Sequence, residues 1–454
     1  MVRPNLVPLR VLPNREQSAA SDRATVEVYR PFFTAGIITV LTAGCLLGAI
    51  ALFGISRAGT YTASAWTPHI LAHANSQLFG WVGFFVIGFA LQQHPPKVGK
   101  LLLFERLARA SMVSLALGIA LRFAAEPLVY SNRELGIGLG VVACILQIAG
   151  VVCFVTNTSL TRHRSGQPMG WQTVFVFVSL FWFLGVTLAE LPIFLGSHQS
   201  SGSASIQFVA EWFPILRDAQ FLGFVATMIF GVSQSKFSSC FGARVADRTL
   251  AFMGLASWTV GIFVRMFGHT WAYRQGFEGS SNLFHYVGGL CLTVGALYVV
   301  GASKVFGPME GSLRSHKFIR AAFSWLIVVG VLVIAEPFHL RLTGQLFSHA
   351  YSGAIRHALT VGFISQMIVG VGSHVITRMN DLDEATLPSL WPTFWLMNVG
   401  NLGRVACEIG TDYNRTFFIP MGITGFLELV GLLLWAAPML RAMYPKSLVV
   451  RNGS

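Results

Sequence analysis

Apolar stretches separated by short polar segments recur along the whole chain. Twelve of them approach or exceed the roughly 20 residues that a helix needs to cross about 30 Å of hydrocarbon. They lie at residues 31–54, 69–92, 101–124, 135–155, 171–194, 217–235, 250–267, 284–305, 319–335, 353–375, 391–405 and 418–439. The pattern predicts an all-α, polytopic membrane protein, with a polar tail at residues 1–30 and a single transmembrane domain at residues 31–454.

The composition supports a membrane protein and argues against a soluble one. Hydrophobic residues make up 54% of the chain and charged residues 11%, whereas soluble domains carry about 25% charged residues. The six cysteines are scattered without C-x-x-C spacing. They therefore indicate neither a disulfide framework nor a thiolate metal site.

The net charge of +13 would suggest nucleic-acid binding in a soluble protein, but here the positive-inside rule explains it better. With the N-terminus inside, 22 of the 32 Lys and Arg residues fall in the inner segments. We therefore predict cytoplasmic N- and C-termini, a lipid bilayer as the surroundings and no nucleic-acid partner. The first 30 residues hold five arginines and no apolar core, so we expect a polar tail rather than a signal peptide.

A threefold repeat organises the predicted helices. The segment HANSQLFGWVGFFVIG (73–88) is followed by RDAQFLGFVATMIFG (217–231) and RHALTVGFISQMIVG (356–370). Aligning Asn75, Asp218 and His357 gives offsets of 218 − 75 = 143 and 357 − 218 = 139, and superposes two glycines of each segment. The same offsets relate RFAAE, RMFGH and RVACE one helix later. We predict three four-helix modules (about 31–165, 166–315 and 316–440) around a pseudo-threefold axis, with the glycines in tight helix contacts.

Polar residues of the repeat form a layer near the outer ends of the predicted helices. The layer holds the three aligned residues and three pairs from the following helices: Asn75, Asp218 and His357, with Arg122/Glu126, Arg265/His269 and Arg404/Glu408. A charge deep in a bilayer costs about 3 kcal/mol or more, so these positions are candidates for function. Two interpretations of the arginines are open: an ion pair with a glutamate four residues on, or neutralisation of an anion such as the haem propionates.

Eight of the twelve histidines belong to the same outer side: His69, His73, His198, His269, His285, His339, His349 and His357. A single one is explained by hydrogen bonding at the interface. As a set they favour a cofactor site, since neutral imidazole binds haem iron, copper and zinc. His94, His163, His316 and His374 fall towards the inner side and are expected to be interfacial residues.

The segments HANSQLFGWVGFFVIGF (73–89) and RHALTVGFISQMIVGVGSHV (356–375) resemble the two signature helices of the NnrS family, membrane proteins with twelve spans linked to nitric oxide tolerance. The layout is also similar to subunit I of the haem-copper oxidases and nitric oxide reductases. The resemblance implies haem, and secondarily copper, in a bacterial-type inner membrane. His73 matches the first histidine of the family's His-Ala-His core, Asn75 stands in place of the second, and His357 matches the histidine of the tenth helix.

The resemblance therefore implies His73 and His357 as an axial haem pair, with His69 and His349 as substitutes. The arginines of the layer would then bind the cofactor's anionic groups, and the remaining polar residues are secondary candidates: Arg122, Arg265 and Arg404, then His269, His285, Asp218, Asn75, Glu126 and Glu408.

A complete oxidase or reductase site would place a second metal on several histidines of the sixth and seventh helices. These helices offer only Asp218 and His269, so we predict no dioxygen reduction. The resemblance implies a haem-binding protein that handles or responds to nitric oxide. Two alternatives stay open: a transporter built on the buried Asp, Arg and Glu residues, and a metal-free, oxidase-like scaffold subunit of a larger complex.

Overall fold

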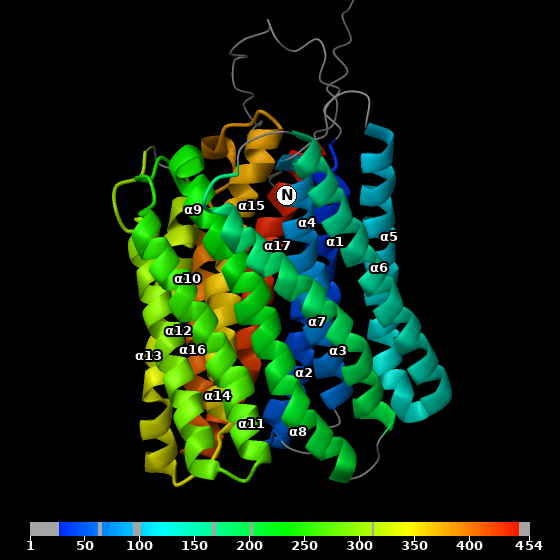
Figure 1. Cartoon of the computed structure of the whole chain (residues 1–454), viewed down its shortest axis with the longest axis vertical. Helices are drawn as coiled ribbons and strands as arrows, with labels where there is room; N and C mark the ends of the chain where they lie inside the picture. Colours follow the sequence, from blue (N-terminus) through cyan, green and yellow to red (C-terminus); the bar gives the residue numbers. More distant parts are fainter. Residues whose placement is uncertain are drawn as a thin grey trace, which may run out of the picture.

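The computed structural model describes residues 27–61, 66–93, 101–165, 169–199, 203–310 and 313–444. Within these ranges the regular elements are all helices, and most of them run side by side along the long axis of the molecule (Figure 1). Most of the predicted polar tail, residues 1–26, lies outside the described residues, as does His94.

The helices follow one another from end to end of the bundle. The first six predicted spans are α1 (Tyr29–Thr39) with η1 (Val40–Gly44) and α2 (Cys45–Ala58); α3 (Thr67–Asn75) with η2 (Ser76–Gly83) and α4 (Phe84–Gln93); α5 (Leu101–Ser131); α6 (Arg133–Ser165); α7 (Thr173–Gln199); and α8 (Ser203–Asp218) with η3 (Ala219–Ala226) and α9 (Thr227–Phe241).

The last six predicted spans are α10 (Arg248–Phe263) with η4 (Val264–Gly268) and α11 (His269–Arg274); α12 (Glu278–Ser303); α13 (His316–Thr343); α14 (His349–His357) with η5 (Ala358–Ser365) and α15 (Gln366–Met379); α16 (Trp391–Gly410); and α17 (Phe418–Met443). Two short 3₁₀ turns, η6 (Glu384–Thr386) and η7 (Arg415–Phe417), precede α16 and α17.

Each of the twelve predicted spans is therefore a helix. Eleven helices of the described chain are long and apolar enough to cross a membrane, and the twelfth span is the 20-residue α16. Several helices run well past the apolar stretch, as α6 does by ten residues, because a helix continues into the polar interface until its capping or turn residues end it. The protein is a multi-pass, all-helical membrane protein; its grouping into three oxidase-like modules stays a prediction.

Three spans form the centre of the bundle. In α3–α4, α8–α9 and α14–α15, 72%, 72% and 67% of the most apolar stretch is buried, against 33% to 44% in the other eight. These spans are the second helix of each predicted module. Each carries an eight-residue π-helical segment, η2, η3 or η5, whose first residues lie at 219 − 76 = 143 and 358 − 219 = 139. The backbone irregularity thus recurs at the offsets of the sequence repeat.

The repeated glycines allow a neighbouring helix to approach each π-helical segment closely. An added Cβ would come within 2.3 Å of Thr39 at Gly80, 2.6 Å of Trp182 at Gly223 and 2.5 Å of Trp325 at Gly362. The three approaching side chains come from the first helix of each predicted module: α1, α7 and α13. The predicted packing role of these glycines is therefore confirmed.

Candidate functional site

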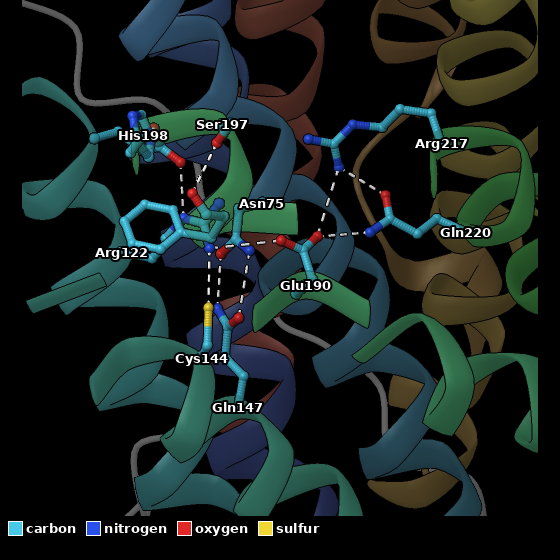
Figure 2. A network of polar contacts seen from close by, with 11 residues as sticks. Asn75, Arg122, Cys144, Gln147, Glu190, Ser197, His198, Arg217 and Gln220 are labelled. Atoms are coloured by element: carbon cyan, nitrogen blue, oxygen red, sulfur yellow. Dashed lines mark hydrogen bonds and ion pairs between the residues drawn. The ribbon is translucent and has the colours of Figure 1, made fainter. Parts of the chain in front are cut away.

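Arg122 on α5 lies at the centre of a buried polar network between the first and second predicted modules (Figure 2). Its Nε donates to Glu126 Oε1 over 2.7 Å, and its Nη1 donates to Cys144 Sγ over 3.1 Å. The guanidinium also lies 3.5 Å from Glu190 on α7 and over the ring of Phe194. The intrahelical ion pair is thus formed, and the guanidinium is occupied by protein groups.

The network continues across α7 and α8–η3. Gln220 Nε2 donates to Glu190 Oε1 over 2.7 Å, and Arg217 Nη1 donates to Gln220 Oε1 over 2.6 Å. His198 Nε2 lies 3.2 Å from Glu126. All of these side chains are buried, and the two arginines are balanced by two glutamates. The network therefore holds α5, α7 and α8 together without an uncompensated charge.

Asn75, a secondary ligand candidate, is engaged in a separate pair. Its Oδ1 accepts from Gln147 Nε2 over 2.7 Å, and its Nδ2 donates to Gln147 Oε1 over 3.4 Å (Figure 2). Both side chains are fully buried between α3 and α6. The amide at this position joins two helices, which explains how asparagine serves where the family core has histidine.

The junction between the second and third predicted modules has its own polar pairs. Asp218 Oδ2 lies 3.4 Å from Arg265 Nε, and His285 Nε2 lies 3.0 Å from Glu336 Oε2. His269 Nδ1 lies 2.7 Å from a serine hydroxyl on α12, and its ring centre is 5.2 Å from that of His285. These three secondary candidates thus pair locally, far along the chain from His73.

The third junction lies between α16, α17 and α14. Arg404 and Glu408 on α16 form an ion pair of 3.0 Å. His357 Nδ1 lies 2.9 Å from the Gly353 carbonyl and 3.3 Å from Glu408. Two nitrogens of Arg404, Nε and Nη1, are buried without a hydrogen-bond partner among the described residues, and so is one carboxylate oxygen of Glu428 on α17.

His73 reaches this junction from α3. Its Nδ1 lies 2.9 Å from the carbonyl oxygen of Gly44, and a Cβ added at Gly48 would lie 2.6 Å from the ring. The charges of His357 and Arg404 are close enough to act on His73. The structure therefore brings the two histidines of the predicted axial pair to one junction, with one of the three candidate arginines.

A missing acid distinguishes this junction from the other two. At those junctions the first helix of the following module supplies Glu190 or Glu336. The corresponding positions in the first module, 190 − 143 = 47 and 336 − 286 = 50, lie in a stretch (44–50) without acidic residues. Gly44 and Gly48 make room there for the imidazole of His73, and Arg404 keeps its unpartnered nitrogens.

The substitute ligands lie apart from this pair. His69 packs on Trp66 with ring centres 5.3 Å apart, and the exposed His349 packs on Phe347 at 4.8 Å. Among the described residues, neither makes a hydrogen bond or ring contact with His73 or His357.

The donor set at the third junction fits haem better than a metal ion held by protein groups alone. No group of three or more His, Cys, Asp or Glu side chains among the described residues could hold a metal ion, whereas haem needs only two axial protein ligands. Carbonyl oxygens hold Nδ1 of His73 and His357, which is how ligating histidines are commonly oriented. The described residues offer neither Nε2 a hydrogen-bond partner, so both nitrogens are available.

Several polar residues of these junctions were not predicted as site residues: Gln147, Glu190, His198, Arg217, Gln220 and Glu428. Glu428 is a lone carboxylate in the apolar stretch of α17, and an intramembrane carboxylate is itself a signal of function or of a buried partner. The glutamines carry no such signal, because only their contacts reveal a role.

Comparison with known proteins agrees with the two signature segments. No curated protein matches the chain. The model of the NnrS protein family matches residues 26–445, which is nearly the whole chain. The predicted resemblance is therefore confirmed, and the chain belongs to the NnrS family.

Proposed function

We propose that this protein binds haem at the third junction, with His73 and His357 as axial ligands, and takes part in nitric oxide handling or response. Haem iron supplies a position at which nitric oxide binds when an axial ligand is displaced. The nitric oxide part of the proposal comes from the family; the haem part comes from the residues of the junction.

One observation carries the haem proposal. Two histidines from helices far apart in sequence share a junction, and a backbone carbonyl orients each one through Nδ1. The ring contact with Gly48 restricts His73 further. His357 also lies 3.3 Å from Glu408, and a carboxylate near Nδ1 raises the basicity of the ligating nitrogen. His73, oriented by a neutral carbonyl, is then the more easily displaced of the two ligands.

Arg404 supports an anionic cofactor. Its unpartnered Nε and Nη1 are buried, and a buried donor without an acceptor costs about 1–3 kcal/mol. A haem propionate would supply the acceptor through charge-assisted hydrogen bonds. Arg122, by contrast, is already occupied by Glu126, Cys144 and Glu190.

An absorption spectrum of the purified protein tests the proposal. The wild type should show a Soret band, and His73→Ala or His357→Ala should lower haem content about tenfold or more, as loss of an orienting or ligating group does. The matched control is His349→Ala, an exposed histidine at the start of α14, which should keep the band. Nitric oxide added to the reduced protein should shift the band.

Gel filtration must show that each variant stays folded. A colourless wild type, or a Soret band unchanged in both histidine variants, would refute the haem site.

The transporter alternative has less support. The charges of the first junction are paired with one another and buried, and the polar layer lies towards one end of the helices rather than at the midplane expected of a transport site. A colourless preparation that took up substrate, and lost uptake in Asp218→Asn, would favour it. A colourless protein that copurifies with partner subunits would favour the scaffold alternative.

A further inference from the structure

A cavity lies apart from the His73–His357 junction, among spans of the second and third predicted modules. It has about 550 Å³ of empty space, including its opening, between α10, α12, α13, α8–η3 and α14–η5. Figure 1 shows α10, α12 and α13 side by side along one edge of the bundle. The wall is mainly apolar and includes Phe221, Leu222, Trp258, Leu292, Ala296 and Leu326.

Three charged side chains line the same cavity: Asp218, Arg265 and Arg356. Asp218 balances one arginine, since it lies 3.4 Å from Arg265 Nε. Arg265 Nη1 is nevertheless buried without a hydrogen-bond partner in the described part of the chain, and no carboxylate of those residues forms an ion pair with Arg356. The charged part of the cavity therefore has one uncompensated positive charge and a free buried donor.

The charges lie at one end of the cavity. Arg265 is level with Gly289 and Val333, because a Cβ added at Gly289 would lie 3.6 Å from Arg265 Nη1 and 2.7 Å from Val333. Trp258, Ala296 and Leu326 are seven residues from these three positions, about 10 Å along each helix towards its middle. The cavity thus has a cationic outer end and an apolar inner part.

This cavity is distinct from the proposed haem site. Arg356 and His357 are neighbours on α14, and successive helical residues point about 100° apart. Arg356 lines the cavity, while His357 faces Glu408 at the third junction. One helix therefore separates the two sites and contributes a residue to each.

We propose that the cavity binds a long-chain carboxylate, a fatty acid anion, with its carboxylate at Arg265 and Arg356 and its chain along Trp258 and Leu326. The uncompensated positive charge selects an anion over a neutral amphiphile. The chain direction matches that of a membrane leaflet, with the head towards the helix ends and the tail towards the middle. Enclosure by five spans fits a single chain and not a diacyl lipid.

Fluorescence quenching tests the proposal on the full chain in detergent. Dibrominated stearate should quench tryptophan emission saturably, and Trp258→Phe should remove most of the saturable quenching. Arg356→Gln should weaken stearate binding about tenfold, the loss expected for one charge-assisted hydrogen bond. The matched control is Arg341→Gln, another exposed arginine near the same end of the bundle.

Dibrominated stearyl alcohol, which has the same chain without the charge, should bind weakly to the wild type and no worse to Arg356→Gln. Equal affinity for acid and alcohol, or saturable quenching that persists in Trp258→Phe, would overturn the site. Equal binding by Arg356→Gln and Arg341→Gln would overturn the role of Arg356. Tighter quenching by a brominated anionic phospholipid than by stearate would overturn the single-chain assignment. The haem absorption of each variant reports the other site independently.

Discussion

At the scale of single residues, the three outer-layer arginines differ in what they have left to bind. Arg122 is paired with carboxylates and a thiol, Arg265 with Asp218, and Arg404 with Glu408 alone. Arg265 and Arg404 keep buried nitrogens without partners in the described structure, whereas Arg122 does not. Since an unsatisfied buried donor is costly, the two arginines mark the places where a ligand is expected.

Glu190→Gln should destabilise the protein strongly, because it leaves Arg122 and Arg217 with one carboxylate fewer in a buried network. Breaking a buried ion pair costs about 3–5 kcal/mol. The matched control is Glu211→Gln, whose partner Arg274 is exposed and whose loss should cost about 1 kcal/mol or less. Thermal unfolding in detergent measures both; equal shifts would contradict a structural role of the network.

Gly48→Ala should displace the imidazole of His73, because the added methyl would lie 2.6 Å from the ring. Loss of this orientation should lower haem affinity about tenfold, as for other changes behind a ligand. The control is Gly185→Ala on α7, where an added Cβ meets no atom within 4 Å. Haem titration followed at the Soret band measures the effect, and identical titrations for the two variants would speak against His73 as a ligand.

At the scale of the helices, the π-helical segments of the central spans bring first and second helices of each predicted module together. A π-helical turn has an extra residue and changes the direction of the side chains that follow it, and such turns are frequent at functional sites. His357 directly precedes η5, and Asn75 directly precedes η2. The segments therefore set the orientation of the helices just inside the polar layer.

Gly223→Ala should destabilise the protein by about 1–3 kcal/mol, the usual cost of overpacking, because its Cβ would lie 2.6 Å from Trp182. Gly185→Ala again serves as the control, since alanine there meets open space and favours the helix by about 1 kcal/mol. Denaturation in detergent compares the two. A neutral Gly223→Ala would show that the close contact of η3 and α7 is not needed.

At the scale of the whole molecule, α16 decides the topology. It carries Asn401, Arg404 and Glu408 and falls outside the eleven most apolar helices, yet these polar residues are buried and Trp395 and Leu402 are exposed. Polar groups inside and apolar groups outside are expected of a helix that faces lipid on one side and protein on the other. We therefore count α16 as a span, which puts the two termini on one side.

Single cysteines at Ser389 and Asn414 test this topology, because both residues are exposed and lie on either side of α16. In intact cells, a membrane-impermeant maleimide should label Asn414→Cys, while Ser389→Cys should label only after the membrane is opened. The unmodified protein controls for its six native cysteines. Labelling of both positions from outside would mean that α16 does not cross and that the termini lie on opposite sides.

The sequence by itself determined the number and order of the helices and the repeat. Hydrocarbon forces long apolar runs on every lipid-facing helix, and the offsets of 143 and 139 are visible in the residues themselves. The π-helical segments had no such signal, because they depend on how neighbouring helices pack. Only the tertiary structure decided that Asn75 pairs with Gln147 and Arg122 with Glu190, while Arg404 and the two histidines stay available. Hydrogen bonds and charges act over a few ångströms, so their partners are known only once distant helices lie side by side.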